Sequence, residues 1–595
     1  MPPGHTSGNG PPAMRDDLEK IVYEMNPSIR QSMRFSKFDF KDMDHLITVN
    51  DSYAGKGDAG GSEIVNNTRY IQNEGGKNPK SDHSNSSYMN PDIKNPKNSD
   101  LREFNLSLKK KYGGICEVYL GGHRRIILSR PEYVEKLLST SIKQTTFSAR
   151  THHVQGLEEL KVLDKGLLFN NNLKSWRFNR QFFTQAILTP SFKNDAVLWA
   201  YKLFEELDGY WKSLMSNTSN DNEHEWSLEV DFSQWFHRFS YDIVVVLTTG
   251  ERSYSMASYY NSLSTTKVQL PNALIENSDK FVNEVRNHIL GLTIFMSISS
   301  FMRHYSPFIR NKVISLLKNR DCLFERLDCI IKRRRKEIEE AENTELRNDM
   351  LTYLITANTD RNINRIKPIE DEKMRPMTDD EIRINLLDAF VNGTDTTANL
   401  FCFLTYHLCH NPQVKQRVLA EIDKYFPSKT IHEITYQNLS KLKFCEAVIM
   451  ETNRLTPTVN NITRYSTDTC EIAGYKWGKG QYFAINIIGL HLNEDYWDDP
   501  EVFNPNRFYH NSNDNNEDVD DTVMLNHKFS FSIFGGGLRI CPGRKLAIIE
   551  LLALMTLVYG KYDFELCNMN EELKVKSAGI TSCQELKVII KPRRI

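Results

Sequence analysis

Apolar residues recur at helical spacing over most of the chain, and short runs of a strand-like period interrupt them. The first clear pattern is an amphipathic helix predicted over residues 101–112. The runs 115–120 and 125–129 flank Gly121-Gly122 and are typical of a β-hairpin. A second helix is predicted over 131–138. The chain from 101 onward therefore begins with a helix, a hairpin and another helix.

A long helix is predicted from Thr378 to His410. Thr378 and Glu381 have the spacing of a capping box, and a proline after Asn411 ends the pattern. Such a helix spans roughly 50 Å at ~1.5 Å per residue. Its apolar centre is interrupted by the sequence Asn-Gly-Thr-Asp-Thr-Thr at 392–397. Glycine weakens a helix and Thr and Asp compete for its backbone, so this local conflict indicates function.

The rest of the chain is also mainly helical. Residues 185–370 and 442–455 have helical patterns, and 544–559 is a long apolar helix. Residues 586–590 are predicted as a closing strand. Residues 51–100 are instead rich in Gly, Asn, Ser, Lys and Asp, which predicts a flexible insertion or linker. We therefore divide the chain into a low-complexity extension, 1–100, and a folded region, 101–595.

Composition excludes several classes of protein. The 595 residues carry a formal charge of −1, which gives no case for a nucleic-acid partner. Ten cysteines occur without a Cys-x-x-Cys pair, so no zinc site is predicted and the thiols are expected to be reduced. No uncharged apolar run reaches about 18 residues, so no transmembrane helix is predicted. The N-terminus lacks the apolar core of a signal peptide.

Candidate chemistry is concentrated at Cys541, in the glycine-rich stretch Phe-Gly-Gly-Gly-Leu-Arg-Ile-Cys-Pro-Gly at 534–543. A cysteine just before a helix feels unpaired backbone N–H groups and the positive end of the helix dipole. We expect this environment to lower the thiol pKa and favour the thiolate, which is a nucleophile or a metal ligand. Arg539 can supply a fixed cation for a nearby anion. A buried structural cysteine is the alternative interpretation.

The full pattern is Phe-x-x-Gly-x-Arg-x-Cys-x-Gly, met by Phe534, Gly537, Arg539, Cys541 and Gly543. It resembles the haem-binding loop of the cytochrome P450 family. The resemblance implies haem b as cofactor, with the Cys541 thiolate as axial iron ligand and Phe534, Arg539 and Gly543 beside it. It also implies the family's fold, which is mainly α with smaller β-sheets. The haem then lies between the long central helix and the cysteine loop.

Two further segments match the family's haem-binding positions. Trp176 and Arg180 lie four residues apart on one helix face, and both can donate hydrogen bonds to a carboxylate. By resemblance they contact a haem propionate, although an ordinary amphipathic helix gives the same spacing. Arg464 lies ten residues after Arg454, where the family often has another propionate-binding arginine.

The polar centre of the long helix resembles the family's oxygen-binding signature. By resemblance, Gly393 makes room above the iron, and Asp395 and Thr396 relay protons to bound dioxygen. Asn392 departs from the pattern, because the family usually has alanine or glycine there. Its larger amide is the feature that favours a different reaction.

A structural triad is implied by two more motifs. Glu451 and Arg454 are three residues apart on a predicted helix and can form an ion pair. Arg507 belongs to a Pro-x-Arg-Phe motif and would join them. A buried charged group of this kind is stable only if every charge is paired and hydrogen-bonded.

The resemblance implies a monooxygenase that inserts one atom of dioxygen into a small apolar organic substrate. Since no flavin or nicotinamide motif is present, electrons would come from NADPH through a separate reductase. Two alternatives remain: a haem-thiolate isomerase, dehydratase or phenol-coupling enzyme, and a haem-binding protein without turnover. Segments 147–166, 459–463 and 578–581 are the candidate substrate pocket.

Family resemblance places the protein on the cytosolic face of the endoplasmic reticulum membrane. Residues 288–309 are mostly apolar and would belong to the lid, either packing on the core or contacting a membrane. Pro2, Pro3, Pro11 and Pro12 resemble the hinge after an anchor helix. We therefore expect either a preceding anchor or a peripheral or cytosolic protein. The basic run 332–336 is predicted as a solvated helix face, with an acidic redox partner as the alternative.

Overall fold

The structure is a computed structural model that describes most of the chain from residue 101 to residue 593. The described part excludes 121–122, 142, 152–153, 217–225, 272, 275–277, 342–345, 362–374, 429, 431, 510–526 and 578. Before residue 101 it includes only β1 (Ile47–Thr48). The helices and strands from Leu101 onward belong to one compact unit, Thr48–Ile595. The predicted extension 1–100 lies almost entirely outside the described residues, so the predicted domain division stays a prediction.

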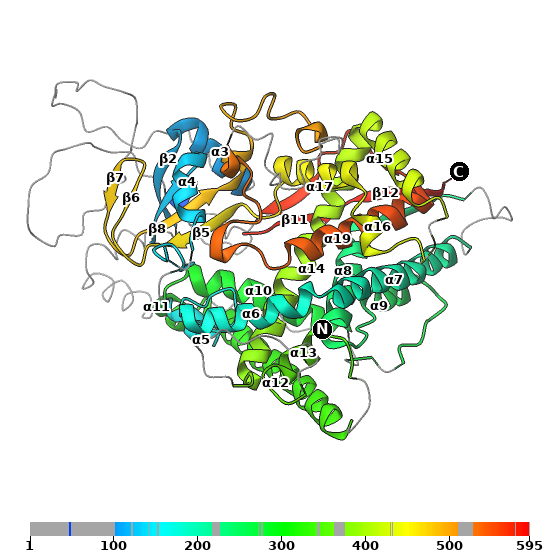
Figure 1. Ribbon diagram of the computed structural model, residues 1–595, viewed down its shortest axis with the longest axis horizontal. Helices are drawn as coiled ribbons and strands as arrows, with labels where there is room; N and C mark the ends of the chain where they lie inside the picture. Colours follow the sequence, from blue (N-terminus) through cyan, green and yellow to red (C-terminus); the bar gives the residue numbers. More distant parts are fainter. Residues whose placement is uncertain are drawn as a thin grey trace, which may run out of the picture. The chain divides into compact units, whose positions relative to one another are not determined.

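Helices form most of this unit, which confirms the predicted fold class (Figure 1). The α-helices are α3 (Leu101–Tyr112), α4 (Pro131–Leu138), α5 (Gln155–Glu159), α6 (Leu173–Leu188), α7 (Pro190–Ser216), α8 (Phe232–Thr249), α9 (Ser255–Leu263), α10 (Ser278–Ser297), α11 (Ser300–Tyr305), α12 (Arg310–Glu340), α13 (Met350–Thr356), α14 (Asp379–His410), α15 (Pro412–Tyr425), α16 (Tyr436–Leu439), α17 (Lys443–Leu455), α18 (Ile487–His491) and α19 (Arg544–Leu554). Short 3₁₀ turns are η2 (Pro505–Arg507), η3 (Lys528–Ser530) and η4 (Gly537–Arg539).

The strands form small separate sheets. They are β2 (Ile115–Leu120), β3 (His123–Leu128), β4 (Leu228–Asp231), β5 (Asn461–Tyr465), β6 (Cys470–Ile472), β7 (Tyr475–Trp477), β8 (Tyr482–Asn486), β9 (Tyr562–Leu566), β10 (Lys574–Ser577), β11 (Thr581–Glu585) and β12 (Lys587–Pro592). Strands β2, β3, β8 and β5 lie side by side in that order. The pairs β6–β7 and β10–β11 are hairpins, and β12 lies between β4 and β9.

The first sheet is built from segments far apart in sequence. The predicted hairpin is confirmed as β2 and β3, and β3 pairs in parallel with β8, with Ile126 opposite Phe483. Both side chains are buried beneath α4, whose Val134 and Leu137 belong to the same apolar cluster. Because alternate residues of a strand face the same side, this register directs one face of the sheet onto α4.

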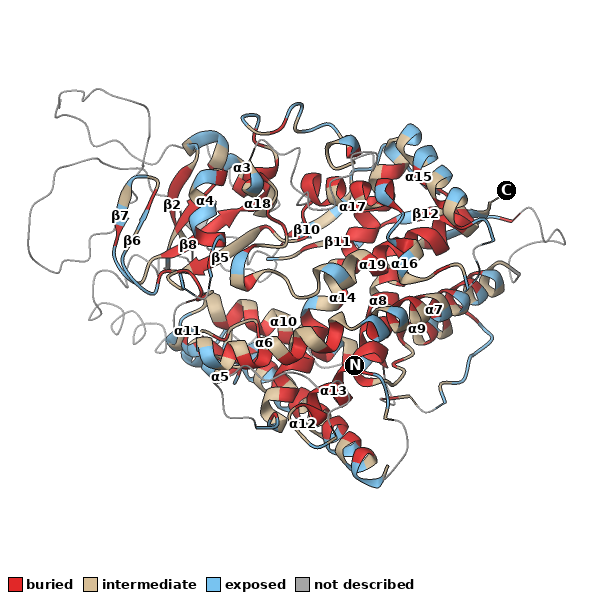
Figure 2. Cartoon of the chain, viewed as in Figure 1, coloured by how far each residue is buried: buried red, intermediate tan, exposed pale blue. Residues whose placement is uncertain are grey.

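Helix α14 forms the centre of the helical region, where it packs against α8, α12 and α17. Its predicted capping box is present: the Thr378 hydroxyl accepts from the Glu381 N–H, and the Glu381 carboxylate accepts from the Thr378 N–H. Figure 2 shows buried residues where the helices meet and exposed ones on the outer face of α15. The long helix is therefore stabilised by its cap at one end and by burial along its length.

The predicted apolar lid, 288–309, is divided between two helices. Residues of α10 such as Leu292 and Phe295 are buried, whereas Phe301 and Tyr305 of α11 are 50% and 72% exposed. Beyond α11, the Phe308 side chain is 74% exposed. The first half of this segment therefore packs on the core, and an exposed apolar surface begins with α11.

The carboxylate of Glu159 links helix α5 to this lid. Glu159 accepts from Arg303 Nη2 at 2.5 Å and pairs with His304 Nε2 at 2.9 Å, and both partners lie on α11. The Glu159 carbonyl also accepts from Arg320 of α12. A Cβ on Gly156 would overlap the Phe295 carbonyl, so α5 and α10 are in direct backbone contact. We call Glu159, Arg303, His304 and Arg320 the lid clasp.

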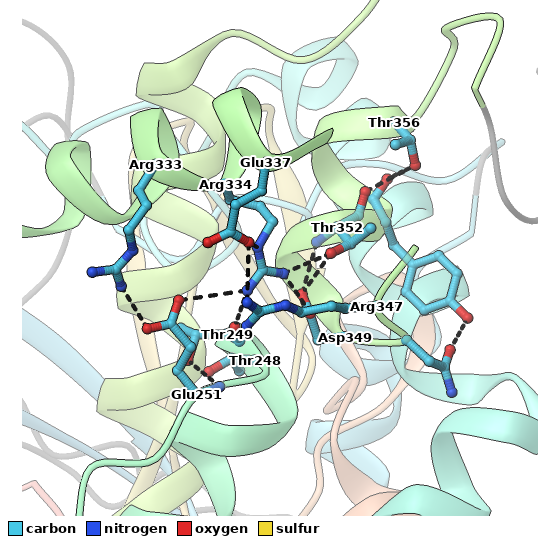
Figure 3. A network of polar contacts seen from close by, with 12 residues as sticks. Thr248, Thr249, Glu251, Arg333, Arg334, Glu337, Arg347, Asp349, Thr352 and Thr356 are labelled. Atoms are coloured by element: carbon cyan, nitrogen blue, oxygen red, sulfur yellow. Dashed lines mark hydrogen bonds and ion pairs between the residues drawn. The ribbon is translucent and has the colours of Figure 1, made fainter. Parts of the chain in front are cut away.

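In the basic run 332–336, the last four residues pair with acidic residues of this chain. Figure 3 shows the pairs of Arg333 and Arg334. Arg334 is 2% exposed and contacts Asp349 Oδ2 at 2.5 Å. Arg333 pairs with Glu251, and Arg335 pairs with Asp379. The predicted solvated face is wrong at Arg334, because the residue joins α12 to α13 in the interior. These internal pairs also leave less positive charge for an acidic redox partner.

The apolar helix after Cys541 is shorter as an α-helix than predicted. Helix α19 ends at Leu554 and continues as a π-helical turn, η5 (Met555–Tyr559). A π turn adds one residue to the helical repeat and so rotates the residues that follow. Leu442–Leu455 and the closing strand are confirmed as α17 and β12, each within one or two residues.

Candidate functional site

Cys541 lies in a loop whose closure depends on glycine. We call residues 534–543 the cysteine loop. The Cys541 N–H donates to the Phe534 carbonyl at 2.9 Å. Gly535 and Gly537 have φ angles of 71° and 59°, in the left-handed region. A Cβ on Gly537 would collide with the carbonyl oxygens of Leu138 and Thr140, so only glycine fits there. The loop therefore requires Gly537 of the sequence pattern and favours glycine at 535, whereas a Cβ on Gly543 would meet no atom within 4 Å.

The predicted low pKa of the Cys541 thiol is wrong in its net direction. Burial is the largest influence and raises the pKa above its usual value. The predicted opposing influences are present, because the backbone N–H groups of Gly543 and Arg544 and two guanidinium groups favour the thiolate. The loss of hydration on burial raises the thiol pKa by more than these groups lower it. A bound metal cation would reverse this balance, since a coordinating thiol is deprotonated.

Arg539 is held in place by backbone carbonyls. Its Nε donates to Ser148 O at 2.7 Å and its Nη2 to Asn170 O at 2.6 Å, with Nη1 3.3 Å from Leu167 O. Its guanidinium carbon lies 4.2 Å from the Trp176 ring centroid. The side chain is 2% exposed. Arg539 therefore fastens the cysteine loop to the segment between α4 and α6 as a fixed cation.

Trp176 and Arg180 bring helix α6 onto the cysteine loop. Arg180 Nη2 donates to the Ile540 carbonyl at 2.7 Å, and its guanidinium lies 5.9 Å from the Trp176 ring. Further along α6, Asn179 Oδ1 accepts from Asn385 of α14 at 2.6 Å. Helix α6 thus contacts both the cysteine loop and the long central helix.

Arg464 and Arg150 complete a group of four guanidinium groups near Cys541. Arg464 Nη2 would lie 3.8 Å from a Cβ on Gly535, and Arg150 Nη2 is 3.3 Å from the Arg539 carbonyl. Sequence reasoning missed Arg150. The bridge between Ala149 and Tyr465 places it beside Arg464, and no local pattern signals this long-range pairing. We call Arg150, Arg180, Arg464 and Arg539 the arginine cluster.

No carboxylate among the described residues forms an ion pair with a member of the arginine cluster, although Asp388 favours the charge of Arg150 and raises its pKa against the larger effect of burial. Among the same residues, the Nε atoms of Arg150 and Arg464 have no hydrogen-bond partner. Burial lowers the pKa of Arg464 to about 9, and burial and the other three cations lower that of Arg539 to about 8. Guanidinium groups stay charged in proteins, so these directions express the loss of hydration on burial and, after it, the repulsion among neighbouring cations. The cluster fits a ligand with carboxylates, such as the two propionates of haem b.

One loop connects the cysteine loop to α14. The Leu167 N–H donates to Asp388 Oδ2 at 2.6 Å, while the Leu167 carbonyl accepts from Arg539. A Cβ on Gly166 would lie 2.5 Å from the same Asp388 oxygen, so the loop approaches α14 very closely. Burial raises the pKa of Asp388 to about 6. Sequence analysis did not single out Asp388, whose role depends on this long-range contact.

The polar centre of α14 is arranged by its own backbone. The Thr396 hydroxyl donates to the Asn392 carbonyl at 2.8 Å, and the Asn392 amide donates to the Asp388 carbonyl at 2.7 Å. A Cβ on Gly393 would lie 3.2 Å from Val244 of α8. The contact visible for Gly393 is therefore close packing of two helices, and its place above an iron stays a prediction.

Asp395 is directed toward α8. Its Oδ1 lies 3.9 Å from His237 Nε2, and its side chain is 22% exposed. It also lines a small cleft between α8, α10 and α14. Asp395, the acid predicted to carry protons, is therefore accessible to solvent through this cleft. The sequence alone did not predict this access.

Glu451, Arg454 and Arg507 are brought together as expected from the motifs. Arg454 Nε and Nη2 each lie 2.8 Å from a different Glu451 oxygen, and both residues are fully buried. Arg507 Nε lies 3.5 Å from Glu451 Oε1. Arg454 also donates to the carbonyls of His491 and Pro500. Every charge in the group is thus paired or hydrogen-bonded.

The predicted pocket segments meet near β5. Val459 bridges Ile580, the Thr581 N–H donates to Thr458 O at 2.9 Å, and Asn460 Nδ2 lies 3.1 Å from Thr581 Oγ1. Ala578 lies outside the described residues. Two of the three segments are therefore in contact, and the third reaches the same strand through the bridge between Ala149 and Tyr465.

Comparison with known proteins decides the family. The sequence model of the family described as Cytochrome P450 matches residues 94–591. This chain belongs to the cytochrome P450 family. It is 23% identical to cytochrome P450 3A56 of Fundulus heteroclitus, covering 79% of this chain and 83% of the relative. It is 24% identical to (S)-1-hydroxy-N-methylcanadine 13-hydroxylase CYP82X2 of Papaver somniferum, covering 82% and 84%.

The solved structures agree on the fold. The crystal structure of cytochrome P450DA heme domain has a TM-score of 0.65 and 18% identity, covering 83% of this chain and 93% of that one. Cytochromes P450 use haem b with cysteine thiolate ligation and receive electrons through a reductase. The protein is therefore an oxidoreductase of the monooxygenase class, with haem b as its cofactor. Among the described helices, none is both long and apolar enough to cross a bilayer.

Proposed function

We propose that Cys541 ligates the haem iron of this cytochrome P450 and that the enzyme inserts one atom of dioxygen into an apolar organic substrate. The observation that carries the proposal is the arginine cluster, a buried set of cations that forms no ion pair among the described residues and lies beside Cys541. Buried charges are stable only when they are paired, so this site calls for an anionic ligand. Haem b supplies both the propionates and the iron that activates dioxygen.

The predicted residues around the haem and the dioxygen site would then have the following roles. Arg464 and Arg539, together with Arg150, would hold propionate carboxylates by charge-assisted hydrogen bonds. Trp176 and Arg180 would donate to the same carboxylates from α6. Phe534, Gly537 and Gly543 shape the cysteine loop around the sulfur. On the opposite side, Asp395 and Thr396 would pass protons along α14.

The separate reductase and the membrane are the proposed partners. We find no flavin or nicotinamide motif among the described residues, so we expect NADPH to act only through a reductase. The exposed apolar surface formed by Phe301, Tyr305, Phe308 and Ile314 supports contact with a membrane at the lid. We place the enzyme on the cytosolic face of the endoplasmic reticulum. Flotation of the protein with phosphatidylcholine vesicles, reduced in a Phe301→Ser and Phe308→Ser variant, would support this placement.

The test of haem ligation is a reduced, carbon-monoxide-bound difference spectrum of the purified protein. We expect a strongly red-shifted Soret band that Cys541→Ser abolishes. Cys567→Ser replaces an exposed cysteine and is the matched control, which should keep the wild-type band. A wild-type protein without haem, or a Cys541→Ser variant with the same band, would refute the proposal.

Asn392 is the observation behind a second candidate, a haem-thiolate isomerase, dehydratase or phenol-coupling enzyme. In the structure the Asn392 amide is tied to the Asp388 carbonyl, which keeps it along the helix. Intact Asp395 and Thr396 support the monooxygenase instead. Product formation that requires neither dioxygen nor a reductase would favour the second candidate.

A further inference from the structure

A histidine on α8 lies beside the acid of α14, and neither family motif includes it. His237 Nε2 is 3.9 Å from Asp395 Oδ1. His237 Nδ1 is 2.7 Å from the Ser233 carbonyl, and a carbonyl can only accept, so Nδ1 carries a hydrogen. This hydrogen bond fixes the ring with Nε2 toward Asp395. The free lone pair of the neutral ring thus faces the acid.

The surroundings allow water to reach this pair. His237 and Asp395 both line the small cleft between α8, α10 and α14, together with Tyr241 of α8 and Arg286 of α10. The separation of 3.9 Å exceeds a direct hydrogen bond, and one water or a small side-chain movement closes it. Val282, Val285, Ile289 and Thr394 form the remaining wall. The pair therefore lies in a cleft of mixed polar and apolar lining, whose polar groups can hold a bridging water.

We propose that His237 passes protons from the cleft between α8, α10 and α14 to Asp395. Solvent protonates Nε2. The Nε2–H bond then breaks as an O–H bond forms on the Asp395 carboxylate, which restores the neutral ring. The step moves one proton and no electrons, so it needs no further reagent. The inference rests on the proposed function, because it supplies the protons that Asp395 and Thr396 deliver.

The surroundings of the His237 ring bind its proton weakly, which favours transfer of the proton to Asp395 over its retention on the ring. Burial is the largest influence on the His237 pKa and lowers it. Asp395 on α14 and the Ser233 carbonyl raise it, while Arg286 on α10 and Arg238 on α8 lower it. Arg238 is held by the Gln234 carbonyl and stacks 4.2 Å from the Tyr259 ring, so it does not occupy the gap. A histidine that binds its proton weakly gives it up readily to a neighbouring carboxylate.

The pair itself can be tested without turnover. In protein labelled with ¹³C at histidine Cε1, the His237 signal is assigned by its loss in His237→Gln. Its pH titration is then compared between the wild type and Asp395→Asn, both loaded with haem. Removal of the carboxylate should lower the titration midpoint of His237, because Asp395 stabilises the imidazolium. An identical midpoint in the two proteins would overturn the proposed pair.

The relay is tested by NADPH-driven dioxygen consumption with a surrogate reductase in H₂O and D₂O, with no substrate added. His237→Gln keeps a side chain that can donate to Ser233 but cannot relay a proton. We expect consumption to fall about tenfold, less than loss of a direct general acid, because water in the cleft substitutes in part. The solvent isotope effect, which is the ratio of the consumption rates in H₂O and D₂O, should also change in this variant. His237→Glu, which can bind and release a proton, should recover much of the rate.

A purely structural role predicts equal loss in the Gln and Glu variants, and that result would overturn the relay. His288→Gln is the matched control: this buried histidine of α10 does not line the cleft, so its variant should consume dioxygen at the wild-type rate. If His237→Gln kept the wild-type rate and the wild-type isotope effect, the relay would be overturned while the proposed function would stand. A wild-type protein that consumes no dioxygen would instead refute the proposed function, and the relay with it.

Discussion

The Glu451 carboxylate offers the sharpest test of how the buried triad stabilises the fold. Both of its oxygens face Arg454 at 2.8 Å, and Oε1 also accepts from the Asn504 N–H at 2.8 Å. Arg507 lies 3.5 Å away. Glu451 and Arg454 are both fully buried. One carboxylate therefore neutralises a buried guanidinium and fastens α17 to the segment before η2.

Replacement of Glu451 by Gln keeps the size of the side chain and removes its charge. The Arg454 cation then remains in the interior without an anion, and the new amide NH₂ faces a donor. Breaking a buried pair in this way costs about 3–5 kcal/mol. Arg454 keeps the carbonyls of His491, Pro500 and Val502, so we expect the lower end, about 3 kcal/mol. This raises the unfolded fraction roughly a hundredfold, at about 1.4 kcal/mol per factor of ten.

The assay is urea unfolding of haem-loaded protein at pH 7, followed by tryptophan fluorescence and by the Soret band. Glu340→Gln is the matched control, because Glu340 forms an exposed pair with Lys336 at 3.6 Å. We expect that variant to remain within about 0.5 kcal/mol of the wild type. If Glu451→Gln also remained within about 1 kcal/mol, the carboxylate would not be compensating the Arg454 charge, and our reasoning would be wrong.

Three further predictions concern other charged groups. Burial raises the Glu550 pKa from 4.5 to about 8, so the folded state binds this proton more tightly than the unfolded chain. Wild-type stability should therefore fall from about pH 4.5 to pH 8, and Glu550→Gln should melt higher at pH 8.5, whereas equal melting would contradict this. Asp349→Asn removes the buried partner of Arg334, which keeps only the less buried Glu337 and Glu251, and should lower stability by about 2 kcal/mol in thermal melts; an unchanged melt would oppose it. Glu159→Gln releases Arg303 and should speed hydrogen exchange in α5 and α11, and unchanged exchange would rule out the lid clasp.

Local sequence determined the elements. The capping box set the start of α14, and the helix, hairpin and helix from residue 101 occur where periodicity predicts them. These features depend on neighbours within a few positions, so the sequence contains the whole signal. The cysteine loop is similar, because Gly535 and Gly537 are favoured by their backbone angles and Gly537 also by close contact with the end of α4.

Long-range pairing decided the electrostatics of the site. The low thiol pKa expected for Cys541 depended on the adjacent helix start, yet burial by distant segments raises it. Arg334 was expected in solvent from its charged neighbours, but Asp349 draws it into the interior. Burial is a property of the packed structure, and desolvation outweighs local influences when a charge loses water.

By itself, then, the sequence determined which residue types are available and where helices and loops begin. Only the tertiary structure placed Arg150 in the arginine cluster, joined Asp388 to Arg539 through Leu167, and set His237 beside Asp395. Contacts between positions this far apart leave no local pattern, because they arise when separate helices and loops pack together and exclude water.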